Sequence, residues 1–252
     1  MDLGPSLRQE TNVMPATAHD RPIVVAVMQP YFAPYAGYYR LLAAADVFVI
    51  FDCVQFPRRG WVHRNRLPDA KGEAAWLTLP LVAAPYEANI ADLTFAPDAP
   101  AAMAERLRAF PSMTAPSAPA LEFLHAAPFE GGLVDYLEAQ IRVACRLLGL
   151  APRLLRSSTL GVAPELRAQD RILEIVRRVG GAHYVNAPGG VGLYDPATFA
   201  EAGVTLHFLD PHDGPNWSLL HRLSVEPVEA LGEEIRGQTP PALRSGSPIP
   251  SA

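Results

Sequence analysis

The fold class is decided by the stretch from residue 23 to residue 51, Ile23-Val-Val-Ala-Val-Met-Gln-Pro-Tyr-Phe-Ala-Pro-Tyr-Ala-Gly-Tyr-Tyr-Arg-Leu-Leu-Ala-Ala-Ala-Asp-Val-Phe-Val-Ile-Phe51. The apolar run at residues 23–28, rich in β-branched side chains, predicts a strand that is buried on both faces. A proline-punctuated loop follows, then a helix over residues 37–45 and a second apolar strand over residues 47–51. This order predicts a βαβ unit with parallel strands and a right-handed crossover.

The rest of the chain continues this alternation. Further strands are predicted at residues 75–80, 90–95, 153–156, 183–186 and 204–209, and further helices at residues 97–110, 133–148, 167–179 and 196–201. Glycines end two of these helices, as helix-stop signals do. Residues 112–119, rich in Pro, Ser and Ala, are expected to be a linker. The pattern predicts a single three-layer α/β domain over residues 21–236, with a mainly parallel sheet and a helical insertion at about residues 97–150.

Composition narrows the possible classes of protein. With 252 residues, of which 49% are hydrophobic, the chain can bury a full core. A formal net charge of −5 argues against a general nucleic-acid-binding surface. No run reaches the roughly 18 apolar residues of a membrane-spanning helix. The polar residues 1–20 are expected to be a disordered leader rather than a secretory signal, and residues 237–252 a flexible tail.

Cysteine and histidine usage predicts neither a metal site nor a disulfide framework. Cys53 and Cys145 lie far apart in the sequence. The histidines near the C-terminus do not form a metal-ligand spacing with nearby acids. Two such cysteines are typical of a reducing compartment, so we expect a cytoplasmic protein. A homodimer is left open.

An arginine-rich stretch follows the second predicted strand: Gln55-Phe-Pro-Arg-Arg-Gly-Trp-Val-His-Arg-Asn-Arg66. Four arginines fall within nine residues of an acidic chain. Because guanidinium forks match phosphate and carboxylate groups, the stretch predicts a pocket for an anionic small molecule. The alternative is a solvated loop whose arginines pair with surface acids. Trp61 would stack on a sugar or base, or anchor the loop.

Polar residues follow several of the predicted strands. Ligands of open α/β sheets bind beyond the carboxyl ends of the strands, so these residues should surround one crevice. The predicted substrate-binding residues are Tyr31, Gln55, Arg59, Trp61, Arg64, Asn65, Arg66, Ser157, Ser158, Asn186, Gly189 and Gly190. The two glycines would bring backbone N–H groups close to an anion, or form a tight turn.

Asp52, His63 and Gln29 are the candidates for catalysis. Asp52 follows a strand and would act as a general base, or form a salt bridge with Arg59 or Arg64. His63 should be neutral among the arginines, and could act as a base or serve as a surface or binding residue. Gln29 suits the orientation of a polar substrate rather than proton transfer.

Two groups of residues form a recognisable pattern. They are Met28-Gln-Pro-Tyr31, Pro34, Gly37-Tyr38, Asp46, Phe48-Val-Ile50, Asp52, Val54-Gln55, Arg59-Gly-Trp61 and Arg64-Asn-Arg66, and, in the second half, Tyr184, Gly189-Gly190, Tyr194, Phe199 and Gly203-Val204. Together they resemble the WbqC-like family over roughly residues 24–231. The resemblance implies a protein that accompanies O-antigen, other surface-polysaccharide or amino-sugar pathways.

The chain departs from that family at Cys53, where the family usually has aspartate. Cys53 is therefore no family nucleophile. A thiol-nucleophile role would draw on the nearby arginines, but strand alternation would direct Cys53 toward the core.

A fainter similarity is to the nucleotidylyltransferases of HUP type, whose first helix opens with His-x-Gly-His. Tyr35 and Tyr38 stand at the two histidine positions here. The stretch Ser157-Ser158-Thr159-Leu160 is similar to the serine-rich phosphate loop of those enzymes. The similarity implies a Rossmann-like or HUP-like fold and phosphate binding.

Residues and resemblance together predict a transferase. The expected reaction is acyl or aminoacyl transfer to an amine on a phosphate-bearing amino-sugar or amino-acid-derived intermediate. No cofactor is fixed by the sequence; a nucleotide, or an acyl-CoA or acyl-carrier donor, is the candidate. The alternatives are a nucleotidyltransferase on an altered scaffold and a non-catalytic binding or scaffold protein of a glycan assembly pathway.

Overall fold

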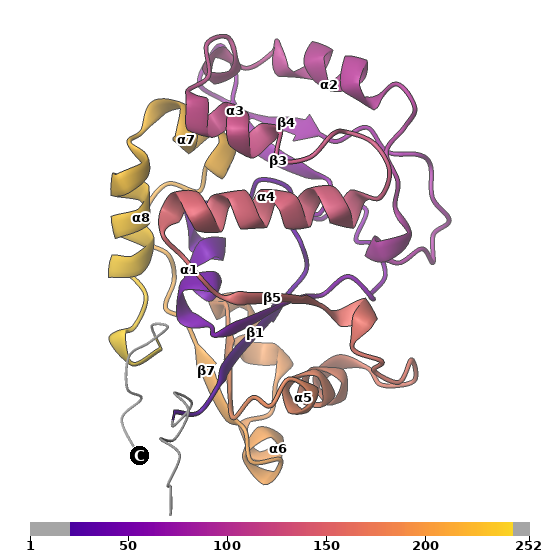
Figure 1. Ribbon diagram of the computed structural model, residues 1–252, viewed down its shortest axis with the longest axis vertical. Coiled ribbons are helices and arrows are strands. Elements are labelled where there is room, and N and C mark those ends of the chain that lie inside the picture. Colours follow the sequence, from indigo (N-terminus) through magenta and orange to yellow (C-terminus); the bar gives the residue numbers. More distant parts are fainter. Residues whose placement is uncertain (1–20, 244–252) are drawn as a thin grey trace, which may run out of the picture.

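A five-stranded parallel sheet forms the centre of the computed structural model, which describes residues 21–243 (Figure 1). Every pair of neighbouring strands is parallel. The strands stand in the order β5-β2-β1-β6-β7 and comprise β1 Val24–Met28, β2 Val47–Ile50, β5 Arg153–Arg156, β6 His183–Asn186 and β7 Thr205–Phe208. The predicted α/β class with a mainly parallel sheet is confirmed.

Helices cover both faces of this sheet (Figure 1). On one face lie α1 (Ala36–Ala44) and α4 (Leu133–Leu148), and on the other lie α5 (Ala168–Arg178) and α6 (Pro196–Glu201). The crossover from β1 to β2 through α1 and the crossover from β5 to β6 through α5 run in opposite directions across the sheet. Because both are right-handed, the two helices lie on opposite faces.

The central strand β1 is apolar throughout because both of its faces are covered. Val24 and Ala26 pack on the side of α1 and α4, whereas Val25 and Val27 pack on the side of α5 and α6. All four side chains are at most 4% exposed. A continuous apolar run, rather than an alternating one, is therefore the pattern that this position requires.

The helix α4 has the boundaries that the sequence predicts. Its buried residues recur three and four positions apart along one face. Gly149 follows with a φ of 67°, the left-handed conformation in which glycine ends helices without a steric penalty. Similarly, β5, β6 and α6 begin and end at the predicted residues.

A separate two-stranded sheet contains part of the arginine-rich stretch. Its antiparallel strands are β3 (Arg64–Pro68) and β4 (Ala74–Thr78). The strand predicted at residues 75–80 thus exists, but it lies outside the main sheet. Only Leu77 of β4 is buried, which suits a hairpin on the surface better than a central strand.

The strand predicted at residues 90–95 is wrong. Ile90–Asp92 is a 3₁₀ helix, closed by a capping box in which the Asn89 N–H donates to Asp92 Oδ2 at 3.0 Å. Thr94 and Phe95 form only isolated bridges. The buried apolar residues there are Ile90 in the 3₁₀ turn and Leu93 and Phe95 after it, and they do not belong to a paired strand.

The linker predicted at residues 112–119 is wrong in its second part. The helix α3 (Ala118–Leu124) begins there, and Ser117 Oγ accepts the N–H of Ala120 at 3.2 Å. Serine is a favoured N-cap and proline is favoured in the first helical turn, so the Pro- and Ser-rich composition belongs to a helix start.

Three more helices complete the described chain: α2 (Ala99–Leu107), α7 (Leu219–Val225) and α8 (Val228–Gly237). The helices α7 and α8 lie outside the sequence prediction; α7 packs on α3, and α8 packs on α1 and α4. Among the helices of residues 21–243, none combines the length and hydrophobicity needed to cross a membrane.

The expected leader, residues 1–20, lies outside the described residues. Of the expected tail, residues 237–243 are described, and Leu243 is only 5% exposed.

Candidate functional site

A cavity of about 700 Å³ lies beyond the carboxyl ends of β1 and β6. The chain leaves β1 toward β2 on one side and reaches β6 on the other, so the loops after these strands diverge. Ligands of doubly wound α/β proteins bind at this switch point of the sheet. We call the cavity the central pocket; its polar lining residues are Gln29, Tyr31, Tyr35, Tyr38, Asn186, Tyr194, His212 and Asn216, and Gly189 and Gly190 line it as well.

Local contacts fix the walls of the central pocket. Tyr38 donates its hydroxyl hydrogen to the Gln29 carbonyl oxygen at 3.0 Å, which holds the turn after β1. Asn186 is 5% exposed, and its Oδ1 accepts the N–H of Ala187 at 2.7 Å. A Cβ on Gly190 would lie 2.5 Å from Asn186 Nδ2. Glycine is therefore needed for the loop after β6 to pack against this amide.

The central pocket is polar but carries no formal charge. Its lining includes no aspartate, glutamate, lysine or arginine. Burial raises the pKa values of Tyr31 and Tyr35, so both phenols stay protonated at neutral pH. Desolvation lowers the pKa of His212, which keeps the imidazole neutral at pH 7. The pocket thus offers neutral hydrogen-bond donors and acceptors.

Arginine and tryptophan side chains stack on one another beside this pocket. We call Trp61, Arg64, Arg66 and Trp76 the Arg–Trp face. The Arg64 guanidinium carbon lies 4.2 Å from the Trp76 ring centre, and that of Arg66 lies 5.2 Å from the Trp61 ring centre. The indole centres are 5.2 Å apart. Cation–π contacts of this kind hold guanidinium groups in place without neutralising their charge.

Within residues 21–243, no acid forms an ion pair with the arginines of this stretch. The ion pairs of residues 21–243 include none of Arg58, Arg59, Arg64 and Arg66. Arg64 instead donates to the carbonyl oxygens of Gly60 and Arg59. The alternative in which these arginines pair with surface acids is therefore wrong for the described part of the chain.

A smaller cavity of about 290 Å³ joins the Arg–Trp face to the central pocket. Trp61, Asn65 and Arg66 line it, and it shares Tyr31, Tyr35 and Asn216 with the central pocket. Arg66 is exposed at this entrance. Asn65 is only 3% exposed, and its amide donates to the carbonyls of Phe32 and Ala33, which ties the hairpin to the loop after β1.

The other members of the stretch lie elsewhere. Arg58 and His63 line a separate cavity, and Arg58 donates to the Ala84 carbonyl oxygen at 2.6 Å. Desolvation, and to a smaller extent the charge of Arg64, lowers the pKa of His63 to about 4. The imidazole is therefore neutral at pH 7, as the sequence led us to expect. Arg59 and Arg64 line neither the central pocket nor the smaller cavity beside it. Of the three proposed anion-binding arginines, Arg66 is the one next to the crevice.

The Asp52 carboxylate faces serines rather than the crevice. Oδ1 accepts from Ser157 Oγ at 2.8 Å and from the Ser158 N–H at 2.9 Å, and Oδ2 accepts from Ser158 Oγ at 2.6 Å. Asp52 is 1% exposed and lines neither the central pocket nor the smaller cavity beside it. These bonds join the ends of β2 and β5. Neither Arg59 nor Arg64 forms the alternative salt bridge with it.

A second large cavity, about 660 Å³, adjoins the central pocket. We call it the flanking pocket. It contains Cys53, Gln55, Arg167 and Arg171, and it shares Phe51, Leu193 and Tyr194 with the central pocket. Cys53 is half-buried and lines this cavity, so the expectation that it faces the core is wrong. The strand ends at Ile50, and alternation does not extend to residue 53.

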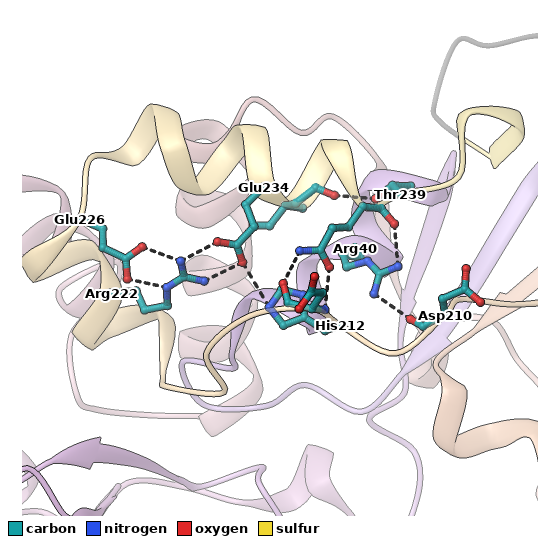
Figure 2. Close-up of polar contacts among 10 residues, drawn as sticks. Arg40, Asp210, His212, Arg222, Glu226, Glu234 and Thr239 are labelled. Carbon is teal, nitrogen blue, oxygen red and sulfur yellow. Dashed lines mark hydrogen bonds and ion pairs between the residues drawn. The ribbon is translucent and has the colours of Figure 1, made fainter.

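His212 belongs to a network of polar side chains beside the central pocket, in which Arg40 and Arg222 are buried and Glu226 and Glu234 are half-buried (Figure 2). Its Nε2 lies 3.2 Å from Glu234 Oε1. Arg222 donates to both oxygens of Glu234 and to both oxygens of Glu226, at 2.5 to 2.8 Å. Arg40 donates to the backbone oxygen of Asp210. This network joins α7 and α8 to the loop that forms one wall of the pocket.

Sequence reasoning missed several residues of the crevice. They are Tyr35, Tyr194, His212 and Asn216 in the central pocket, and Arg167 and Arg171 in the flanking pocket. The Pro- and Gly-rich segment at residues 211–217 carried a signal, because such loops beyond a strand hold ligand-binding residues. Within residues 21–243, no group of three or more His, Cys, Asp or Glu side chains could hold a metal ion.

Comparisons with known proteins give one family and one curated relative. The model of the WbqC-like protein family matches residues 29–223. The uncharacterized protein Rv1507c of Mycobacterium tuberculosis (strain ATCC 25618 / H37Rv) is 27% identical over 203 residues, which cover 75% of this chain and 83% of that protein. No solved structure matches the chain. The family match is consistent with a protein of a biosynthetic pathway.

Proposed function

The chain belongs to the WbqC-like family, and we propose that it is a group-transfer enzyme of a surface-polysaccharide or related pathway, transferring an acyl or aminoacyl group to an amine on a phosphate-bearing amino sugar or amino-acid-derived intermediate. The observation that carries the proposal is the charge pattern of the crevice. The Arg–Trp face brings an unpaired cation to one end, and the central pocket beside it has no carboxylate.

Arg66 and Trp61 form the proposed handle-binding end. A guanidinium without an acid partner keeps its donors for a phosphate, and the neighbouring indole offers a flat face to a sugar or a base. Tyr31, Tyr35 and Asn216 border both cavities, so a ligand whose phosphate lies at Arg66 would place its next few atoms in the central pocket.

The neutral central pocket suits an amine nucleophile. Desolvation lowers the pKa of a bound amine, and a carboxylate that would stabilise the ammonium form is absent from the lining. The bound amine is then neutral and nucleophilic. Gln29 and Asn186 would orient it by hydrogen bonds. In the transfer step a bond forms between nitrogen and the acyl carbon, the bond from that carbon to the leaving atom breaks, and the nitrogen proton ends on the leaving group.

Asp52 has no place in this scheme as a base. Its carboxylate is saturated by Ser157 and Ser158 and does not border the crevice. We assign it to the junction of β2 and β5. His63, the other candidate base, is likewise left out, because it lines a different cavity.

The test combines binding with product detection. Sugar phosphates, nucleoside-diphosphate amino sugars and acyl-CoAs are screened by thermal shift, and ligands that raise the melting temperature are measured by calorimetry. Replacing Arg66→Gln removes a charge-assisted contact worth about 1.5–3 kcal/mol, so affinity for the phosphate-bearing ligand should fall roughly 10- to 100-fold. Arg59→Gln is the matched control, because Arg59 is exposed on the same stretch and lines no described cavity.

Mass spectrometry then detects the product of acyl donor and amine acceptor. An acylated acceptor that depends on Arg66 supports the transferase. Pyrophosphate release from a nucleoside triphosphate would instead indicate nucleotidyl transfer. Tight binding without any product would favour a scaffold role. Equal affinity of wild type, Arg66→Gln and Arg59→Gln would refute the proposed handle-binding end.

A further inference from the structure

The flanking pocket is a second cavity of the size of a small-molecule site. It lies on the side of α5 and touches the central pocket through Phe51, Leu193 and Tyr194. Its lining includes two arginines, two glutamines and an asparagine, but no aspartate or glutamate. The lining of this cavity thus carries no negative charge, although the chain as a whole has a net charge of −5.

Arg171 carries a buried charge without a carboxylate partner. It is 8% exposed and donates to the carbonyl oxygens of Leu166, Pro164 and Cys53 at 2.8, 3.0 and 3.1 Å. No ion pair of residues 21–243 includes it. A buried charge is costly unless an opposite charge compensates it.

Arg222 in the same molecule shows how a buried arginine is usually compensated, by carboxylates. It is 3% exposed, close to the value for Arg171, yet two glutamates surround it (Figure 2). The carbonyl contacts of Arg171 satisfy hydrogen-bonding groups but supply no full negative charge. The missing counter-charge can come from a ligand, because Arg171 lines the flanking pocket.

Two further sources of positive potential border the same cavity. Arg167 is exposed at its edge, where it donates to the Leu166 carbonyl oxygen at 3.0 Å. Ala168 and Gln169, the first residues of α5, also line it, and no side chain caps this helix start; Asp170 in the same turn does not line the cavity. The first N–H groups of a helix lack intrahelical acceptors and, with the helix dipole, favour an anion.

We propose that the flanking pocket binds a second substrate through a diphosphate group, held by Arg167, Arg171 and the start of α5. The ligand would be the diphosphate-bearing donor of the transferred group, so this inference rests on the proposed function. Its reactive end would reach the central pocket past Tyr194, which borders both cavities. The crevice would then have one anion-binding end for the acceptor and another for the donor.

Cys53 provides a reporter for this site that needs no catalytic activity. It is half-buried and lines the flanking pocket, with Sγ 3.4 Å from Arg171 Nη1. The second thiol, Cys145, is buried, and desolvation raises its pKa to about 12, so it reacts slowly. The rate at which iodoacetamide alkylates Cys53, followed by peptide mass spectrometry on the full chain, therefore reports occupancy of this cavity.

The probe is inorganic pyrophosphate, titrated against the alkylation rate and measured in parallel by calorimetry. Wild type should show saturable protection of Cys53. Arg167→Gln should weaken this protection at least ten-fold. Arg177→Gln is the matched control, because Arg177 lies on the same helix, pairs with Glu174 and lines no part of the flanking pocket; it should behave as wild type. Circular dichroism establishes that each variant is folded.

The result also separates this inference from the proposed function. Arg66→Gln should leave pyrophosphate protection of Cys53 intact, whether or not it weakens binding of the acceptor. Coenzyme A and ADP, run as further arms, distinguish an acyl-CoA donor from a nucleotide donor. Absence of protection at saturating pyrophosphate, or equal protection in wild type and Arg167→Gln, would overturn the proposal.

Discussion

The replacement Glu234→Gln probes the network that supports one wall of the central pocket. Glu234 accepts from two nitrogens of the buried Arg222, at 2.8 and 2.6 Å, and its Oε1 lies 3.2 Å from the His212 imidazole (Figure 2). Glutamine has the same shape but only one acceptor oxygen, and its amide N–H groups would face a guanidinium that also donates. One face of Arg222 would then lose its counter-charge, while Glu226 remains on the other.

The expected cost follows from these contacts. Hydrogen bonds to charged groups contribute about 1.5–3 kcal/mol each, and glutamine keeps one of the two in neutral form. We therefore expect Glu234→Gln to lower the free energy of unfolding by about 2–3 kcal/mol at pH 7. Urea unfolding followed by tryptophan fluorescence measures this difference. Glu233→Gln is the control: Glu233 is an exposed neighbour on α8, and its replacement should cost less than about 0.5 kcal/mol.

The pH dependence gives this prediction a second test. Hydrogen bonds from Arg222 lower the pKa of Glu234 below its usual value of 4.5. The charged form is thus favoured in the folded state, so its contribution is complete above pH 4.5 and is lost as the pH falls through the lower folded-state pKa. The difference between wild type and Glu234→Gln should stay constant from pH 7 to about pH 5 and narrow below pH 4.5. A cost under 0.5 kcal/mol at pH 7, or a difference that widens in acid, would refute this account of the network.

Two other residues make predictions that separate structural from catalytic roles. Asp52→Asn should lower the free energy of unfolding by about 1–3 kcal/mol, because Ser157 and Ser158 donate to a charged acceptor in the wild type. Ligand affinity in the crevice, measured by calorimetry on the folded variant, should be unchanged. A loss of activity without loss of stability would restore Asp52 as a catalytic residue. His63 has a folded-state pKa of about 4 against an ordinary 6.5, so stability should decrease as the pH falls from 6.5 toward 4. Solvent screening at this part-exposed site reduces the effect to roughly 1 kcal/mol. Urea titrations at pH 7 and pH 5 should show that His63→Gln loses less unfolding free energy between these pH values than the wild type does. An equal loss in both proteins would contradict the buried neutral imidazole.

The sheet could be predicted because its signals are local. An apolar run such as residues 23–28 has few stable arrangements other than a strand covered on both faces, and Gly149 ends α4 by its own backbone preference. The errors arise where local pattern and tertiary context conflict. Residues 90–95 have strand-like spacing, but the Asn89–Asp92 capping box favours a helical turn. The Ser- and Pro-rich segment before α3 has the composition of a linker and the geometry of a helix start.

The crevice was predictable only in part, for a related reason. The rule that ligands bind beyond strand ends places Gln29, Tyr31, Asn186 and the two glycines of the loop after β6 together, and the structure has them around the central pocket. The orientation of the arginines depends instead on the register of β3 with β4, in which Arg66 stands opposite Trp76. The turn and the pattern of buried residues set the register of a hairpin, but they do not show how the hairpin lies against the rest of the chain. A count of arginines could therefore not reveal that Arg66 is the arginine of this stretch that borders the central pocket's entrance.

Both proposals depend on where the fold places its acidic side chains. The chain has more acids than bases, yet no acid lines the central pocket or the flanking pocket, and two acids of the surrounding structure are engaged by other side chains: Asp52 by serines, and Glu234 by Arg222. A carboxylate lining the central pocket would hold a bound amine as the unreactive ammonium ion and would repel a phosphate at either end. Unpaired cations at Arg66 and Arg171 have the opposite effect on both groups, since they attract the phosphates and disfavour a positive charge between them. A site that must bind two anionic substrates and keep an amine neutral requires this separation of charge, and a site for a cationic ligand would require its reverse.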